Sequence, residues 1–145
     1  MSSVVHPDYH SYRVKRLFQL ISQRIEDVLK PHGLGRTQWQ VLFRVHRAGT
    51  LPQKDLVQAL QVEPATLTGV IDALSAKGWL ERLDSDSDKR CRVLRLSPAG
   101  EELLARIPDP YESVERHMLA GVTPQERELV ERTLEHMITN LEDRS

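Results

Sequence analysis

The sequence predicts a mainly α-helical fold with a small β-wing in its middle, and two observations predict it. Apolar residues recur at the spacing of one helix face along most of the 145 residues. The spacing changes to alternation in only one stretch, where residues 79–83 and 92–96 form two short strand-like runs. A chain of this length is about one domain, large enough to be stable without a metal or a disulfide.

Composition restricts the class of protein and its compartment. Hydrophobic residues make up 39% and charged residues 28%, which are ordinary shares for a globular protein. No apolar run approaches the roughly 20 residues of a membrane span, and the N-terminus does not resemble a secretory signal. The single cysteine, Cys91, cannot form an internal disulfide, which is typical of a reducing compartment. We therefore expect a cytoplasmic protein.

The first two elements are predicted to be helices. Residues 14–29 carry a long amphipathic pattern, which the Pro-His-Gly sequence at 31–33 ends. A second helix is expected to begin at Thr37, whose hydroxyl would cap it while Gln40 reaches back in a capping box. It should stop near Gly49.

Two shorter helices and a hairpin follow. The first helix covers residues 52–60, and the second starts at Pro64, an allowed first-turn proline. Gly78 supplies the left-handed stop of the second helix. The two strand-like runs come next, of which the second alternates cleanly, and the polar residues 84–90 between them predict a hairpin with a long, charged tip.

The C-terminal part is predicted to be helical again. Ser97 is expected to cap a helix that Pro108 and Pro110 interrupt, because an interior proline removes a hydrogen bond and clashes with the preceding turn. Thr123 and Glu126 form another capping box, which marks the start of a last helix.

The order of these elements is that of a helix-turn-helix directly before a β-wing. In a helix-turn-helix the second helix projects its N-terminal face into the DNA major groove, which is about 12 Å wide. Since Leu67, Val70 and Ile71 are needed inside, small residues remain outside, where threonine hydroxyls and methyls can meet base edges. The alternative is an ordinary surface face of a core helix. The outward residues are Pro64, Ala65, Thr66, Thr68 and Gly69.

The hairpin tip carries the second group of candidate DNA-binding residues. Lys89 and Arg90 are placed where a guanidinium could enter a narrow minor groove, whose negative potential attracts arginine. Asp88 is expected to pair with Arg82 and to brace the wing, which leaves Arg90 available. The alternative is a solvated run of charges, because exposed ion pairs contribute under about 1 kcal/mol.

These motifs together resemble the MarR-type winged helix-turn-helix transcriptional regulators. The likeness covers nearly the whole chain and is sharpest in four pieces, 66–74, 77–82, 88–90 and 96–100. It implies an obligate homodimer, formed by the N- and C-terminal helices, that binds a pseudo-palindromic operator and is released by a small aromatic or anionic ligand. Two positions depart from the family pattern. Many relatives have Arg in place of Gly69, and the wing more usually carries Arg in place of Lys89.

Charge supports a division of the chain into three parts. The net charge of −1 is the sum of +2 in residues 1–35, +3 in residues 36–96 and −6 in residues 97–145. We expect the basic middle part to be the DNA-binding domain and the two flanking parts to form the dimerisation region. The first and last helices also carry more apolar surface than a small winged domain can cover, which favours a dimer. A two-fold dimer would place its DNA-reading helices about 34 Å apart.

The resemblance also implies an effector pocket between the dimerisation helices and the winged domain. Trp39 and Phe43 would line this pocket, with Thr37 or Arg16 engaging a carboxylate or phenol. The alternative is that the two aromatic residues belong to the core, as aromatics at helical spacing usually do.

Metal and enzyme chemistry find little support. His6 and His10 have the spacing of a helical ligand pair, but Pro7 lies between them, and no Cys/His cluster has zinc spacing. Nucleotide-binding and hydrolase motifs are absent from the sequence. We therefore expect no metal, no cofactor and no enzyme activity.

The sequence thus predicts a homodimeric, ligand-responsive DNA-binding regulator, expected to be a repressor. Two alternatives remain. One is a winged domain used for protein contacts, with the acidic C-terminal part as the partner surface. The other is a redox-sensing regulator that acts through Cys91, although this thiol can equally be a small hydrophobic residue.

Overall fold

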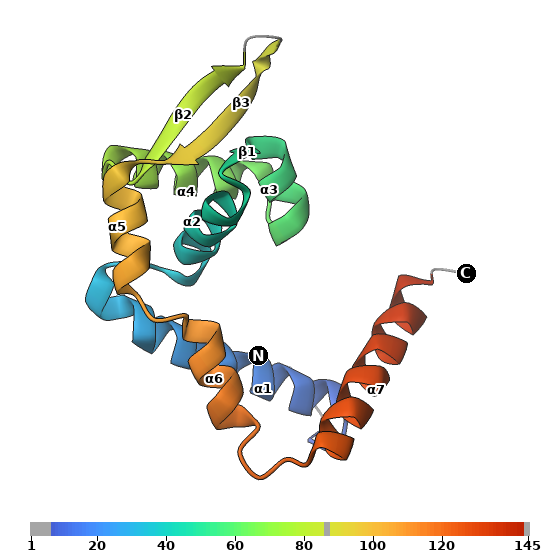
Figure 1. Ribbon diagram of the computed structural model, residues 1–145. Coiled ribbons are helices and arrows are strands. Elements are labelled where there is room, and N and C mark those ends of the chain that lie inside the picture. The colour runs from blue at the N-terminus through green and yellow to red at the C-terminus, as the bar shows by residue number, and fades with distance from the viewer. Residues whose placement is uncertain (1–6, 86–87, 144–145) are drawn as a thin grey trace, which may run out of the picture. The chain divides into compact units, whose positions relative to one another are not determined.

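The computed structural model describes residues 7–85 and 88–143, and for residues 84, 85 and 88–91 it describes only the backbone. The chain divides into two compact units, Met1–Pro110 and Tyr111–Ser145 (Figure 1). The predicted helix, helix, helix, helix, hairpin, helices order is confirmed. In the described ranges, no helix is long and apolar enough to cross a membrane.

The first unit contains five α-helices and one 3-10 turn among its described residues. Their bounds are α1 (His10–Leu29), η1 (Lys30–His32), α2 (Arg36–Ala48), α3 (Gln53–Leu60), α4 (Pro64–Ala76) and α5 (Pro98–Arg106). The predicted cap of α2 was wrong. Gly35 is the N-cap, its N–H donates to Gln38 Oε1 at 3.0 Å, and Thr37 lies inside the first turn. Gly35 has extended backbone, so the helix begins before the threonine and does not need its hydroxyl.

The wing is part of a three-stranded antiparallel sheet with the order β1-β3-β2. The strands are β1 (Thr50–Pro52), β2 (Leu80–Ser85) and β3 (Asp88–Leu96). Sequence reasoning missed β1, because a three-residue strand that contains a proline shows no alternation. The expected long tip was also wrong, because pairing continues to Ser85 opposite Asp88, past an irregularity after Asp84. Polar residues of the tip therefore belong to strands.

The core lies between α2 and its neighbours. α2 contacts α1, α3, α4, α5, β1 and β3, which makes it the central helix of the first unit. Leu94 and Leu96 on β3 are buried while Arg95 is exposed, so the predicted alternation is confirmed. Figure 1 shows the β2–β3 hairpin extending away from this helical core, with α4 at its base. The largest fully buried side chains include Ile25, Leu29, Leu42, Leu56, Leu67, Ile71 and Leu74.

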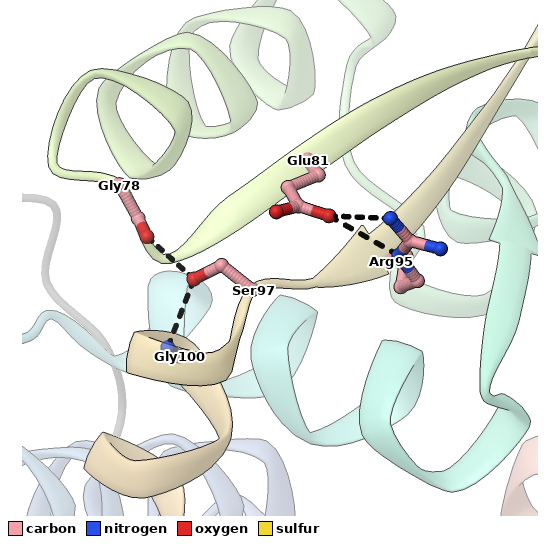
Figure 2. A network of polar contacts seen from close by, with 5 residues as sticks. All are labelled: Gly78, Glu81, Arg95, Ser97 and Gly100. Carbon is pink, nitrogen blue, oxygen red and sulfur yellow. Dashed lines mark hydrogen bonds and ion pairs between the residues drawn. The ribbon is translucent and has the colours of Figure 1, made fainter.

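Four elements meet at a small polar junction around Ser97 (Figure 2). Ser97 Oγ donates to the Gly78 carbonyl at 2.5 Å and accepts from the Gly100 N–H at 3.0 Å. The Ser97 N–H donates to the Trp79 carbonyl at 3.1 Å. Gly78 has φ +77°, the left-handed stop predicted for α4. We call these four residues, Gly78, Trp79, Ser97 and Gly100, the Ser97 junction; it joins the end of α4 and the start of β2 to the end of β3 and the start of α5.

The second unit consists of α6 (Pro110–Met118), which begins at the boundary, and α7 (Pro124–Glu142). The predicted capping box of α7 is confirmed: Thr123 Oγ1 accepts from the Glu126 N–H at 3.1 Å, and the Glu126 carboxylate accepts from the Thr123 N–H at 3.0 Å. The hydrogen bond from the Thr123 backbone, with a smaller contribution from its side chain, lowers the pKa of Glu126 below its ordinary value.

Alanine substitution is expected to have opposite effects on stability at two helical glycines, Gly100 in the Ser97 junction and Gly69 on α4. Replacing Gly100 with Ala would place a Cβ 2.1 Å from the Trp79 carbonyl oxygen. Because that atom is backbone, we expect the free energy of unfolding to fall by about 3 kcal/mol. The control is Gly69→Ala, where no heavy atom lies within 4 Å of the added Cβ. Gly69→Ala should raise the stability by about 0.5–1 kcal/mol. Urea unfolding followed by circular dichroism measures both, and a neutral Gly100→Ala would contradict the tight approach.

Candidate nucleic-acid interface

The first turns of α4 present a small, polar face to solvent. Pro64 stands at the first helical position after the extended N-cap Glu63. Leu67, Ile71 and Leu74 are buried, so the opposite side of the helix faces outward. This orientation is as predicted, whereas contact of the face with DNA stays a prediction. We call this set the reading face; its exposed residues are Pro64, Ala65, Thr66, Thr68 and Gly69.

The two threonines of the reading face have different surroundings. Thr68 Oγ1 donates to the Pro64 carbonyl at 3.0 Å and accepts from Gln53 Nε2 at 3.4 Å. The Thr66 hydroxyl has no hydrogen bond to another described side chain. Gln53 is the first residue of α3, so this contact connects the first turns of α3 and α4.

An open groove of about 460 Å³ lies between α3 and β3, beside the reading face. Two exposed cations line it, Lys54 on α3 and Arg92 on β3. Sequence reasoning missed both residues. Arg92 could have been found from the strand alternation, since its neighbour Val93 is half-buried, but Lys54 shows no pattern. We call this feature the α3–β3 groove; its lining is Pro52, Gln53, Lys54, Val57, Pro64, Thr68 and Arg92.

The predicted residues of the wing are only partly described. Lys89, Arg90, Asp88 and Cys91 belong to the backbone of β3, but their side chains lie outside the described residues. Their predicted DNA contacts, and any redox chemistry of Cys91, therefore stay predictions.

Arg82 has a partner that the sequence analysis did not expect. Its guanidinium donates to the carboxylate of Asp72 on α4. The bond ties β2 to α4, so Arg82 braces the wing against this helix. The expected Asp88 partner lies across the hairpin, and only the folded packing of α4 against β2 brings Asp72 within reach. The Arg82–Asp88 pair itself stays a prediction.

The candidate effector residues separate into different surfaces. Trp39 and Phe43 on α2 stack with centroids 4.8 Å apart and an interplanar angle of 13°. Arg16 lines another hollow, formed by α1 alone, and Thr37 lines neither. The buried residues of α1 are Ile25 and Leu29. Arg16 lies nine residues before Ile25, or about 13 Å along the helix. Residues 16 and 37 are thus not brought together with the aromatic pair.

The stacked aromatic pair lines a cavity of about 250 Å³ between α2 and α5. At its polar edge, His46 Nδ1 lies 2.6 Å from Glu101 Oε2. The Arg47 guanidinium lies over the Phe43 ring, 5.7 Å from its centre. Within the described ranges, no group of three or more His, Cys, Asp or Glu side chains could hold a metal. We call this feature the Trp39 cavity; its lining is Trp39, Phe43, His46, Glu101, Leu104, Ala105, Ile107 and Asp109.

Two helices expose apolar stripes of the kind that marks an interface. In the first unit α1 exposes Val14, Leu17, Phe18 and Leu20. In the second unit α7 has no buried residue at all, although its pattern is amphipathic. Exposed apolar patches of this extent indicate contact with another surface. The exposed apolar residues of α7 are Leu129, Val130, Leu134, Met137, Ile138 and Leu141.

Comparisons with known proteins find similarity to MarR proteins. The family model "MarR family" matches residues 34–92, from the start of α2 to the middle of β3. The chain is 27% identical over 128 residues to the multiple antibiotic resistance protein MarR of Salmonella typhimurium, covering 85% of this chain and 89% of that protein.

Two solved structures share the fold. The Staphylococcus aureus MepR–DNA complex has a TM-score of 0.84 at 20% identity and covers 91% of this chain and 98% of that one. Bordetella bronchiseptica BpsR, whose DNA binding is regulated by 6-hydroxynicotinic acid, has a TM-score of 0.80 at 23% identity and covers 94% and 97%.

Proposed function

Because this chain is a MarR-type winged helix-turn-helix transcriptional regulator, we propose that it binds a pseudo-palindromic double-stranded DNA operator as a homodimer. It acts in the cytoplasm as a repressor that a small aromatic ligand releases. The observation that carries this function is the exposed reading face beside two cations of the α3–β3 groove. A duplex offers the matching surface, because its base edges are flanked by phosphates.

DNA binding combines three contacts in this proposal. The reading face enters the major groove, where its small residues allow a close approach. Lys54 and Arg92 neutralise phosphates on one side of α4, which sets the register of the helix on the duplex. Lys89 and Arg90 reach the minor groove from the wing. The structural neighbour MepR has been solved in complex with DNA, which supports DNA as the partner of this fold.

The homodimer forms through the exposed apolar stripes of α1 and α7. Burying these side chains in a second copy removes apolar surface from water, which contributes about 25 cal/mol per Å². A two-fold pair also presents two reading faces to successive major grooves, which a single chain cannot do. The acidic C-terminal part belongs to this dimer region, away from the phosphates.

The Trp39 cavity is the candidate effector site. Stacked aromatic walls suit a planar ring, and a cavity of about 250 Å³ holds a single-ring molecule. Its ionisable lining consists of two carboxylates, from Glu101 and Asp109, and one imidazole, from His46, so acidic groups predominate and a neutral ligand fits better than an anion. The effector must bind the DNA-competent and released states unequally in order to shift their populations.

The alternative function, a winged domain used for protein contacts, fits the wing and the acidic tail but not the small reading face. Protein interfaces are centred on large aromatic or Arg residues, whereas this face consists of Pro, Ala, Thr and Gly. The duplex is therefore the better partner.

Removing the groove cations tests the phosphate contacts. Lys54→Ala and Arg92→Ala should each weaken binding to any duplex and reduce the slope of log K against log salt by about 2 per dimer. The effect should not depend on sequence, because phosphates carry no base information. The control is Arg106→Ala, the same loss of charge on α5, outside the groove. Arg90→Ala should also weaken binding. Fluorescence anisotropy at several salt concentrations measures all four variants, and affinity that is insensitive to salt would contradict DNA binding.

A charge placed on the apolar stripe of α7 tests the dimer. Leu134→Glu should halve the mass found by sedimentation equilibrium, from twice 16.6 kDa to 16.6 kDa, because the interface cannot bury the carboxylate. Thr139→Glu is the matched control, since it adds the same side chain on the opposite face of α7. A Leu134→Glu protein that remains dimeric would place the interface elsewhere.

Tryptophan fluorescence tests the effector cavity. In a Trp79→Phe background Trp39 is the remaining tryptophan, and its emission should change when 4-hydroxybenzamide binds. The anion 4-hydroxybenzoate should bind several-fold more weakly, because Glu101 and Asp109 line the cavity. Phe43→Ala should remove the response by destroying the stack. Tighter binding of the anion would contradict the assigned ligand class.

A further inference from the structure

Thr68 is held in one orientation by two hydrogen bonds. Its hydroxyl donates to the Pro64 carbonyl, one helical turn back, at 3.0 Å. The same oxygen accepts from Gln53 Nε2 at 3.4 Å. A hydroxyl has one proton to donate, so Thr68 has no donor left for a DNA base.

The γ-methyl group is therefore the part of the Thr68 side chain that makes no hydrogen bond and remains available for an apolar contact. Threonine side chains occupy staggered rotamers, and in a helix the hydroxyl can bond back to the carbonyl four residues earlier. With the hydroxyl turned toward Pro64 and Gln53, the methyl takes the other heavy-atom position on Cβ, and the residue as a whole is exposed. Thr66, whose hydroxyl has no described side-chain partner, keeps both a donor and an acceptor. The two threonines offer different chemistry to a duplex.

The side-chain amide of Gln53 is only partly satisfied by hydrogen bonds. Its Oε1 is buried and has no hydrogen-bond partner among the residues that the structure describes. A buried acceptor without a hydrogen bond destabilises the fold, because it has lost its contact with water. The described hydrogen bond of this amide is the one to Thr68, on the wall of the α3–β3 groove.

We propose that Thr68 reads the C5-methyl group of a thymine through its own γ-methyl, and that Gln53 is the positioning residue that holds it there. The inference rests on the proposed function, since it requires the reading face to lie in the major groove. Thymine is the one DNA base of the four that shows a methyl group in that groove, and an apolar contact can select it. Gln53 acts from α3 without contacting the base. Operator preference therefore depends on a residue outside α4.

Replacing thymine by deoxyuridine isolates this contact, because it removes the methyl and leaves base pairing unchanged. Sequences bound by the unaltered protein are first selected from a random duplex pool. Each thymine of the enriched operator is then replaced by deoxyuridine, symmetrically in both half-sites, and the Kd is measured by anisotropy. One thymine position should lose roughly fourfold in affinity per half-site, the value of one buried methyl.

Four variants assign the effect to Thr68 and Gln53. Thr68→Val puts methyl groups at both heavy-atom positions on Cβ, so it needs no orienting hydrogen bond and should keep the preference for thymine over deoxyuridine. Thr68→Ser keeps the hydroxyl but has no methyl, so it should lose the preference. Gln53→Ala should reduce the preference at unchanged salt dependence, and Gln58→Ala, an exposed glutamine on the same helix, should leave it intact. Thermal melting verifies that each variant is folded; the preference between two bases does not follow from stability.

The outcomes separate the two proposals. Loss of the preference in Thr68→Val with retention in Thr68→Ser would overturn the inference, because the hydroxyl would then read the base. An enriched operator in which no thymine is sensitive to the methyl would also overturn it while leaving DNA binding intact. Failure to enrich any sequence would instead contradict the proposed function itself.

Discussion

The close approach of Gly100 to the Trp79 backbone, closed by the Ser97 hydroxyl, is the contact on which the DNA-binding part depends. No side chain other than hydrogen fits at residue 100, because a Cβ would meet the Trp79 carbonyl at 2.1 Å. Ser97 is 7% exposed, and its one hydroxyl satisfies both the carbonyl that ends α4 and the N–H that begins α5. The junction therefore fixes α4 and both strands of the wing relative to one another. Across the hairpin, the Glu81–Arg95 pair at 2.8 Å adds a further tie (Figure 2).

This rigid frame explains how a face without large side chains can be specific. The reading face consists of small residues, so its position relative to the duplex depends on the elements around it. Arg82 and Asp72 connect the wing to α4, and Gln53 connects α3 to Thr68. The packing of α2 against α4 and β3 holds the DNA-reading helix and the wing on the same core. Base recognition by short side chains requires such support, because a gap of about 1 Å already forfeits up to about half of the energy of a methyl contact.

The parts of the fold that local chemistry determines could be predicted from the sequence. Pro64, Gly78 and Ser97 mark helix ends by their own backbone or hydroxyl preferences, and the structure places each where it was expected. One local prediction, the Thr37 cap of α2, was wrong, because Gly35 begins the helix two residues earlier. Other errors concern contacts between distant residues. β1 exists because β3 offers it a partner, and Asp72 meets Arg82 because α4 packs on β2. Lys54 and Arg92 come together only across the α3–β3 groove, so neither could be recognised from its sequence neighbours as part of a candidate site.

Hydroxyl-radical footprinting of the selected operator tests the central claim most directly. Two reading faces held by a two-fold dimer should protect two symmetric patches on one side of the duplex, centred about one helical turn, or roughly 10 base pairs, apart. A single unpaired patch, or two patches on opposite sides of the duplex, would contradict the account.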